Sequence, residues 1–359
     1  MIYEDQHSLK NLLQIKAQNL GFELFGVAEI KDVPELTLFE KWLALGYAGE
    51  MHYLAKNKEK RIDPAKLVEN AKSVIMCGAY YHTDAPLSVD QATADSGWIA
   101  RYAWGDDYHD LLKKRIKSLY AYLQEVTDGR TAGRYYVDTG PVLEKAWAKQ
   151  AGLGWIGKNT CLINKSKGSF LFLAAIITDV PMVADQPTID HCGSCTRCLD
   201  ACPTNALVEP YVLDANLCIS YLTIEKKGSI PEHLRDGIGR QIFGCDICQD
   251  VCPWNRKAAK SKEPAFQARE GMVNPSLENI LLLEENAFRE AFRKSPVKRT
   301  KLSGLLRNAI IAAGNSGLSR LIPFLKKYVK CDDETLNEHA EWALAKLESS
   351  IDLNREDKR

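Results

Sequence analysis

The segment His191–Pro203 reads HCGSCTRCLDACP, and its four cysteines follow the spacing C-x2-C-x2-C-x3-C-P. The first three thiols recur every third residue, so they can surround one face of a cubane. The fourth thiol stands directly before a proline. This spacing is typical of cysteines that bind iron–sulfur clusters. The segment therefore predicts an electron-transfer centre within a chain of 359 residues, far more than such a centre needs.

A second segment, Cys245–Pro253, repeats part of this pattern as C-x2-C-x3-C-P. In two-cluster bacterial ferredoxins, the cysteine before the proline binds the other cluster. Crossing the ligands in this way uses every cysteine between residues 192 and 252, with Cys218 completing the second set. The first [4Fe–4S] cluster is then assigned to Cys192, Cys195, Cys198 and Cys252, and the second to Cys202, Cys218, Cys245 and Cys248.

Zinc is the alternative occupant of these cysteines. A zinc ribbon binds its ion through two C-x2-C pairs, usually about 15–20 residues apart. The triplet of residues 192–198 does not fit that pattern, so we expect iron and sulfur. The three other cysteines, Cys77, Cys161 and Cys331, stand apart, and we expect each to be a small buried apolar side chain.

The composition is that of a soluble globular protein, with 45% apolar and 26% charged residues. Lys plus Arg and Asp plus Glu both number 47, so any basic surface for a partner must be local. The sequence has no apolar run of about 18 residues, no signal-peptide pattern and no twin-arginine pair. We therefore expect a cytoplasmic protein without a membrane contact, in which eleven cysteines indicate redox chemistry rather than disulfides.

Hydrophobic patterning predicts an α+β multidomain fold. Buried apolar runs at 72–81 and 168–180 predict strands, and an amphipathic pattern at 109–127 predicts a surface helix. Three amphipathic stretches near the C-terminus, at 302–317, 318–329 and 332–349, predict helices that pack as in HEAT repeats. The expected parts are an N-terminal α/β domain over 1–185, a ferredoxin-like two-cluster domain over 186–258 and a helical HEAT-like domain over 259–359.

One local stretch carries a surplus of positive charge. Six basic residues and no acidic residue lie between positions 293 and 307: Arg293, Lys294, Lys298, Arg299, Lys301 and Arg307. Lys226 and Lys227 follow the Cys218 ligand and extend this surface. Such a group can neutralise several phosphates of a nucleic acid, although a solvated charged face is the usual alternative. GWIGK at 154–158 lacks the spacing of a phosphate-binding P-loop, but Lys158 is a further candidate phosphate contact.

Several stretches resemble one family, the epoxyqueuosine reductases. They are EKRIDPAKLVENAKSVI at 59–75, RYAWGDDYHDLL at 101–112, VDTGPVLEKAWAKQAGLGWIGKNT at 137–160, CISYLTIEKKG at 218–228, FGCDICQDVCPWN at 243–255 and LLRNAIIAAGN at 305–315. Together they cover nearly the whole chain in one order. The resemblance is therefore much more specific than the cysteine spacing alone.

The resemblance implies a reaction and its cofactors. Members of this family use cobalamin and two [4Fe–4S] clusters to reduce the epoxide of epoxyqueuosine at the wobble position of tRNA, which gives queuosine and water. The N-terminal α/β domain would then bind cobalamin and carry out catalysis, and the C-terminal helical domain would bind tRNA. We further expect a monomer that receives electrons from an external low-potential donor of the flavodoxin or ferredoxin type.

The resemblance also assigns roles to individual residues. The proton donor falls on Asp138 of VDTGP, where a partly apolar pocket is expected to raise the pKa of the carboxyl group. The alternative is that Asp138 only forms a turn. The expected cobalamin contacts are Arg61, Asp138, Leu162, Leu173, Ser220, Cys245 and Asp246.

The D-x-H-x-x-G signature of proteins that bind cobalt through a histidine is absent. The nearest approach, DYHDLL at 107–112, lacks the glycine. We therefore expect no histidine of this chain to bind cobalt.

Two other functions fit parts of the sequence. A reductive dehalogenase also joins cobalamin to two such clusters, but generally carries a twin-arginine signal. An electron-transfer module without a substrate would leave Asp138 and the basic stretch unexplained.

Overall fold

A four-stranded sheet forms the centre of the N-terminal part of the computed structural model, which describes residues 6–31 and 33–356. The strands are β1 (Leu24–Glu29), β2 (Ser73–Tyr80), β4 (Gly133–Tyr136) and β7 (Leu171–Thr178). Their order is β1-β2-β7-β4, and all three neighbouring pairs are antiparallel. The two strands predicted from apolar runs are confirmed as β2 and β7, the central pair.

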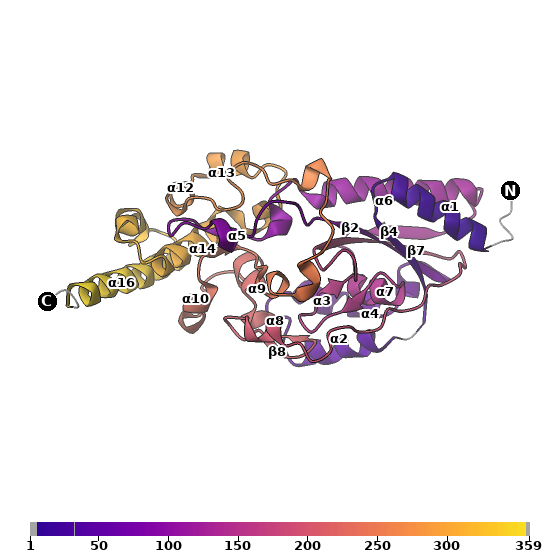
Figure 1. Cartoon of the computed structure of the whole chain (residues 1–359), viewed down its shortest axis with the longest axis horizontal. Coiled ribbons are helices and arrows are strands. Elements are labelled where there is room, and N and C mark those ends of the chain that lie inside the picture. Colours follow the sequence, from indigo (N-terminus) through magenta and orange to yellow (C-terminus); the bar gives the residue numbers. More distant parts are fainter. Residues whose placement is uncertain (1–5, 32, 357–359) are drawn as a thin grey trace.

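Helices cover both faces of this sheet (Figure 1). Helices α1 (Gln6–Asn19) and α6 (Tyr108–Val126) pack on one face, and α7 (Glu144–Gln150) packs on the other. Ile75 and Cys77 of β2 face the first pair of helices, whereas Met76 faces α7. A strand that is buried on both faces has a continuous apolar sequence, and strands of parallel sheets show the same pattern. The expectation of an α/β domain is therefore wrong for this part, because its sheet is wholly antiparallel.

Shorter elements complete the N-terminal part. They are α2 (Pro34–Ala44), α3 (His52–Lys56), α4 (Lys58–Ile62), α5 (Ser88–Gln91), β3 (Trp98–Ile99), β5 (Trp155–Ile156) and β6 (Leu162–Ile163). The cysteine segment contains α8 (Arg197–Asp200), β8 (Leu207–Glu209), β9 (Val212–Leu213), α9 (Ile219–Ile224), α10 (Glu232–Ile238), β10 (Gln241–Phe243) and α11 (Ile247–Asp250). Helices α8 and α11, which lie within the two cysteine motifs, pack against each other.

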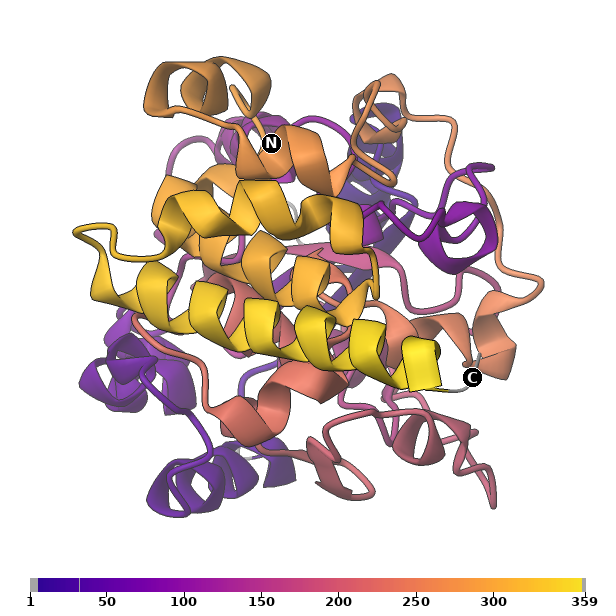
Figure 2. The same ribbon diagram turned by 90° about the vertical axis from the view of Figure 1, so that its left-hand side faces the viewer.

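The C-terminal part is helical and lies at the opposite end of the molecule from the sheet (Figure 1). Its helices are α12 (Leu277–Leu281), α13 (Glu285–Ala291), α14 (Lys301–Asn315), α15 (Ile322–Leu325) and α16 (Glu334–Glu356). Helices α14 and α16 pack side by side (Figure 2). None of the helices in the described part of the chain combines the length and the apolar character of a membrane span.

The helix predicted over 318–329 is broken into short pieces. Its α-helical part is only α15, flanked by single 3-10 turns at Ser319–Leu321 and Lys326–Tyr328. Pro323 has no amide hydrogen and is tolerated only in the first turn of a helix, so a new helix has to begin beside it. The amphipathic pattern alone does not reveal this interruption.

The hydrophobic cores do not follow the expected domain limits. Strand β3, from the N-terminal part, pairs in parallel with β10 of the cysteine segment. Ile99 and Trp104 are buried in the same core as Phe243 and as Leu305 of α14. The segment around residues 98–104 therefore packs with the helical end of the molecule, although it lies well inside the range 1–185.

Candidate active site and cluster region

A cavity of about 1110 Å³ lies where the three parts of the chain meet. The strand ends of the sheet supply Phe172 and Asp138, and the start of α6 supplies His109. Ser220 of α9 and Arg299 of the 3-10 turn at Pro296–Thr300 close the opposite side. The cavity is thus bordered by residues from all three sequence regions that were expected to contribute to function.

Asp138 lies directly after β4, in the loop that was quoted as VDTGP. Its φ of 55° is in the left-handed region, which Asp adopts more readily than most residues other than glycine. Its side chain is half-exposed and borders the cavity. The backbone of Asp138 does form a turn, as the alternative interpretation expected. Its side chain nevertheless borders the cavity.

His109 and Asp107 hold the Asp138 side chain. His109 Nε2 lies 3.1 Å from Asp138 Oδ2, and His109 Nδ1 lies 2.7 Å from Asp107 Oδ1. Asp107 caps the N-terminus of α6 and also accepts a hydrogen bond from the His109 amide. Burial opposes a charge on His109, but the two carboxylates outweigh it and raise the pKa of His109 to about 9.

The same contacts change the expected protonation of Asp138. Burial raises the pKa of this carboxyl group, as the sequence argument assumed. The hydrogen bond and charge of His109 and the charge of Arg299 outweigh burial, so the pKa of Asp138 is lowered. The expectation of a raised pKa is therefore wrong, and the proton of the pair resides on His109.

Two buried charged groups lie behind the Asp138 loop. Arg61 is 7% exposed, and its Nη1 donates to the Gly140 carbonyl at 3.3 Å while its Nε has no partner. Burial and the nearby Asp138 charge raise the pKa of Glu144 to about 8, so this carboxyl group holds a proton near neutrality. Sequence reasoning missed Glu144, whose position at the start of α7 gave no signal. Arg61 was expected at the cavity, but it supports the loop from behind.

The expected cobalamin contacts divide into two sets. Asp138 and Ser220 border the cavity. Arg61, Leu162, Leu173, Cys245 and Asp246 do not border it: Leu162 is buried against α7, and the Asp246 carboxylate accepts from the amide of Arg101. Cys218 does border the cavity, so the second cysteine set reaches its wall.

The eight cysteines fall into two groups of neighbours. Burial raises the pKa of Cys198 to about 11, and the charges of Cys252 and Cys192 add to this rise. Burial also raises the pKa of Cys245, with contributions from Cys218 and Cys202. In the same way, Cys252 is affected by Cys192 and Cys195, and Cys248 by Cys245 and Cys218. These thiol neighbours are compatible with the crossed assignment, and Cys161 adjoins thiols of both groups.

The two groups also lie in different apolar surroundings. Cys192 and Cys252 pack around Trp155, whereas Cys218 and Cys245 pack with residues of α9 and α10. Among the described residues, no three acidic, thiol or imidazole groups are close enough to surround a single metal ion. The thiolates around a cubane lie farther apart than the ligands of a single metal ion. The cysteines of each cluster are therefore assigned from which thiols lie next to one another.

The three remaining cysteines differ from one another. Cys77 is fully buried in the sheet core, as expected. Cys161 lies beside Cys248, and a hydrogen bond between the two thiols lowers the pKa of Cys161 to about 7. Cys331 is half-exposed, and its thiol donates to the Asp333 carbonyl. The expectation of a buried apolar side chain is therefore wrong for Cys331, and for Cys161 it overlooked the second thiol.

Lys158 has a structural contact that the sequence did not suggest. Its ammonium group donates to the carbonyls of Gly193 at 2.7 Å and Cys195 at 3.0 Å. Both carbonyls belong to the loop of the first cysteine motif. Lys158 therefore fixes the cysteine loop to the N-terminal part and is not free to meet a phosphate.

Most of the predicted basic residues are at the surface. Lys294, Lys298 and Arg299 border the cavity, and Arg293 and Lys294 border an adjoining pocket of about 590 Å³ that also contains Arg269 and Arg289. Arg299 forms an ion pair with Glu225 at 2.5 Å. Lys301 is exposed at the start of α14. The basic surface therefore begins at the cavity and continues outward over the C-terminal part.

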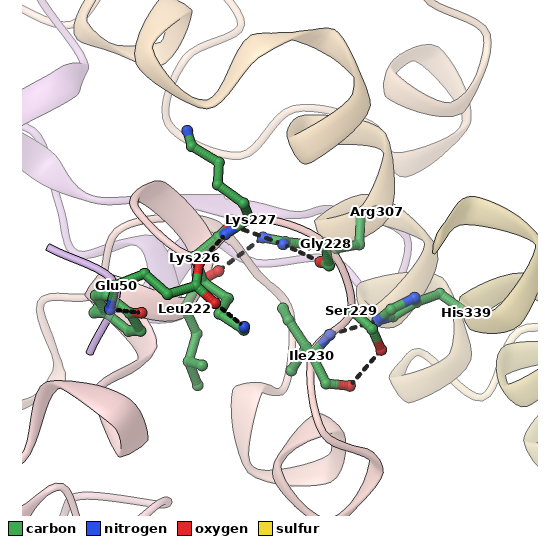
Figure 3. Close-up of polar contacts among 10 residues, drawn as sticks. Glu50, Leu222, Lys226, Lys227, Gly228, Ser229, Ile230, Arg307 and His339 are labelled. Atoms are coloured by element: carbon green, nitrogen blue, oxygen red, sulfur yellow. Dashed lines mark hydrogen bonds and ion pairs between the residues drawn. The ribbon is translucent and has the colours of Figure 1, made fainter. Parts of the chain in front are cut away.

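Arg307 is an exception among these residues, as Figure 3 shows. It is 2% exposed, and it donates to the carbonyls of Leu222, Lys226 and Gly228. Its prediction as a surface contact is wrong, because its aliphatic neighbours on α14 carry it into the core. Lys226 pairs with Glu50, whereas Lys227 is exposed on the turn that Arg307 supports.

Replacing Arg307 with methionine should destabilise the fold by about 3 kcal/mol, because it removes the donor from one buried and two part-buried carbonyl groups. We expect the apparent unfolding temperature to fall by about 5 °C in scanning calorimetry. Lys301→Met on the same helix is the control and should shift it by less than about 1 °C, because Lys301 is exposed. Equal shifts for the two variants would contradict the role of Arg307.

Comparison with known proteins identifies the class of this site. Residues 191–255 match the family model described as "4Fe-4S double cluster binding domain", and residues 61–139 match "Epoxyqueuosine reductase QueG, DUF1730". A cavity lined by acidic and basic side chains, beside a double iron–sulfur domain, is that of an iron–sulfur oxidoreductase.

Relatives define the family. The epoxyqueuosine reductase of Pseudomonas aeruginosa is 42% identical over 331 residues, which cover 91% of each chain. Two solved structures share 31% identity with this chain, and each alignment covers 97% of this chain and 95% of the other. One is an epoxyqueuosine reductase with an epoxyqueuosine-modified tRNA-Tyr stem loop, with a TM-score of 0.87. The other is the Bacillus subtilis enzyme with its catalytic loop swung out of the active site, with a TM-score of 0.86. The chain belongs to the epoxyqueuosine reductase family.

Proposed function

We propose that this protein reduces epoxyqueuosine to queuosine at the wobble position of tRNA, with Asp138 as the proton donor. The observation that carries the proposal is the position of Asp138 in a cavity that also borders Cys218 and the basic residues. This combination gives a proton source, an electron source and a phosphate-binding rim around one space. The proposed enzyme is a cytoplasmic monomer supplied by an external donor of the flavodoxin or ferredoxin type.

Two [4Fe–4S] clusters would carry the electrons to the cavity. Cys192, Cys195, Cys198 and Cys252 would hold the first cluster, and Cys202, Cys218, Cys245 and Cys248 the second. The match to a double cluster domain and the two groups of neighbouring thiols support this assignment. Because Cys218 borders the cavity, the second cluster is proposed as the last donor.

Cobalamin is the proposed cofactor of the cavity. The space of about 1110 Å³ has an apolar wall at Leu171 and Phe172 and polar groups at Ser220 and Thr139, which suits a macrocycle that carries amide side chains. Both ring nitrogens of His109 already face carboxylates, which supports binding without a histidine ligand. When bound, cobalamin supplies a strongly reducing cobalt centre. Ser220 and Asp138 would contact it directly, and the other five predicted contacts would require movement or backbone groups.

The residues of this chain would then supply a proton to the substrate and exclude water from it. Tyr102, Tyr108 and Phe172 border the cavity and would exclude water from the reacting epoxide. The reduction consumes two electrons and two protons, and it converts the epoxide into an alkene and water. Asp138 would give its proton to the epoxide oxygen as that oxygen leaves carbon.

The tRNA substrate is proposed from a relative and from the basic rim. A structure that shares 31% identity contains an epoxyqueuosine-modified tRNA stem loop. In this chain, Arg293, Lys294 and Lys298 would bind the phosphates beside the cavity, and Arg299, which pairs with Glu225, is a weaker candidate. Lys227 and Lys301 would extend this contact, and the ion pair with Glu50 makes Lys226 a weaker candidate.

The mass of the tRNA product tests the function. Anaerobically reconstituted protein is incubated with cobalamin, a chemical low-potential reductant and tRNA that contains epoxyqueuosine. We expect the modified nucleoside to lose the mass of one oxygen atom. An unchanged nucleoside, with both clusters and cobalamin present, would overturn the proposal.

Replacing Lys298 with alanine tests the basic rim. We expect weaker tRNA binding and a salt dependence of log K against log salt that is shallower by about one, because one phosphate contact is lost. Filter binding at several salt concentrations measures both effects. Lys41→Ala on α2, an exposed lysine outside the cavity, is the matched control and should leave the slope unchanged. If both variants give the wild-type slope, Lys298 does not contact phosphate.

A further inference from the structure

The contacts of His109 place its imidazole ring between two carboxyl groups. A carboxylate oxygen can only accept hydrogen bonds, and each ring nitrogen of His109 faces one: Asp107 Oδ1 at 2.7 Å and Asp138 Oδ2 at 3.1 Å. The lowered pKa values of both carboxyl groups and the raised pKa of His109 agree with a cationic imidazole that donates from both nitrogens. The segment DYH does not complete a cobalt-binding signature. Its Asp107 and His109 instead form, together with Asp138, a chain of three proton-binding groups.

The proposed reaction needs more protons than Asp138 alone can hold. Removing the epoxide oxygen as water requires two protons, and a carboxyl group carries one. Asp138 must therefore be reloaded between the first and the second proton transfer. His109 is in hydrogen-bond contact with Asp138, and its side chain is 29% exposed, so it can exchange protons with solvent.

We propose that His109 is the positioning residue that reloads Asp138 with protons, and that Asp107 orients His109 for this transfer. This inference rests on the proposed reduction of an epoxide. A substrate in the cavity removes water from Asp138, so its carboxylate becomes more basic. The proton on His109 Nε2 then moves to Asp138 Oδ2, and Asp138 passes it to the epoxide oxygen. Neutral His109 takes a proton from solvent, and the same transfer supplies the second proton.

The surroundings of the pair hold the proton on His109 at rest, so its transfer to Asp138 depends on the substrate in the cavity. Asp107 stabilises the cationic form of His109 from the N-cap of α6, and Tyr108 stacks on the imidazole ring with centroids 4.0 Å apart. The charged and titratable groups that face the pair from other elements are Tyr53, Arg61, Tyr102, Glu144, Glu225, Lys294, Lys298 and Arg299, together with Asp110 and Lys113 on α6. The charge of Arg299 lowers the pKa of Asp138 and so makes its carboxylate harder to protonate. The group that reloads it therefore has to be in direct contact, as His109 is.

The hydrogen bond also holds the Asp138 loop in the cavity. Asp138 has a φ of 55°, and its loop is fixed on the other side by the contact of Arg61 with the Gly140 carbonyl. His109 thus holds the carboxylate from the cavity side, together with the hydroxyl of Tyr108. Positioning and reloading are separate roles, and the experiment has to distinguish them.

Removal and chemical replacement of the imidazole ring provide the test. Turnover of the reconstituted enzyme is measured with a chemical reductant for wild type, His109→Ala, His109→Gln and the control His233→Ala, whose histidine is exposed on α10. We expect His109→Ala to lower kcat about 100-fold with little change in tRNA affinity, and free imidazole to restore about tenfold. His233→Ala should match wild type, with or without imidazole.

The pH profile gives a second, independent readout. Wild-type turnover should decline as the pH rises through about 9, because His109 then loses its proton. In His109→Gln, Asp138 has to take its proton from water, so the decline should move below neutral pH. Asp107→Asn removes one anion beside His109 and should move the decline to a pH between these two.

The outcomes separate this inference from the proposed function. If wild type forms no queuosine, the proposed function fails. If wild type is active and His109→Ala is also fully active, the inference fails. Loss of activity in His109→Ala without imidazole rescue, and with an unchanged pH profile in His109→Gln, would overturn proton reloading and leave only a structural role.

Discussion

Replacing Asp138 with asparagine should lower the rate of epoxyqueuosine reduction at least about 100-fold, because an amide cannot give a proton to the departing oxygen. Asparagine has almost the same shape and also tolerates the left-handed backbone, since the φ of residue 138 is 55°. We therefore expect unchanged cluster content, cobalamin content and tRNA affinity. Single-turnover measurements with a chemical reductant isolate the reaction from electron delivery.

Asp332→Asn is the matched control for this prediction. Asp332 is exposed in the turn before α16, and its replacement should leave the rate at the wild-type value. A rate for Asp138→Asn within tenfold of wild type would assign the proton to another group. Glu144 would then be the next group to replace, because it lies behind the same loop and its pKa is raised to about 8.

Loss of one cluster ligand should abolish turnover, with at least about a 100-fold decrease, because electrons then cannot reach the cavity. Cys198→Ser, Cys202→Ser and Cys252→Ser should each reduce the iron content from about eight to about four atoms per chain. Cys331→Ser is the control, since Cys331 lies beyond both cysteine groups, and it should keep all of its iron.

Double variants test the crossed assignment directly. Cys198 and Cys252 are assigned to the same cluster, so their double replacement should remove no more iron than either single one. Cys198 and Cys202 are assigned to different clusters although they lie in one motif, so their double replacement should remove both clusters. If the Cys198/Cys202 double variant lost only one cluster and the Cys198/Cys252 double variant lost both, each motif would hold its own cluster.

Patterns among residues that lie close together in the sequence predicted much of this site. The thiol spacings predicted two interlocked cysteine sets, and this assignment stays a prediction that the double variants test. Asp138 was found through the resemblance of its loop, because a single aspartate before Thr-Gly-Pro does not distinguish a turn from an acid. The strands β2 and β7 were predicted because apolar β-rich runs are long and continuous.

The errors arose where a side chain depends on a distant partner. The pKa of Asp138 is lowered rather than raised because His109, far along the chain, reaches its carboxylate. Arg307 stands in a basic stretch, but it is buried because carbonyls of the turn at 226–228 require a donor. Lys158 resembles a phosphate ligand, and only the folded chain brings the carbonyls of the cysteine loop to it. Charge and spacing in the sequence do not contain this information.

The parallel pairing of β3 with β10 has a consequence for how the protein is made on the ribosome. Trp98 and Ile99 leave the exit tunnel long before Gln241 and Phe243, and the α14 residues that bury Ile99 follow later still. The nascent chain therefore has to carry this apolar segment unprotected for most of translation. Domains generally fold as units during synthesis. The core that contains Ile99 is therefore completed only after α14 has been made, whereas the four-stranded sheet has cores of its own.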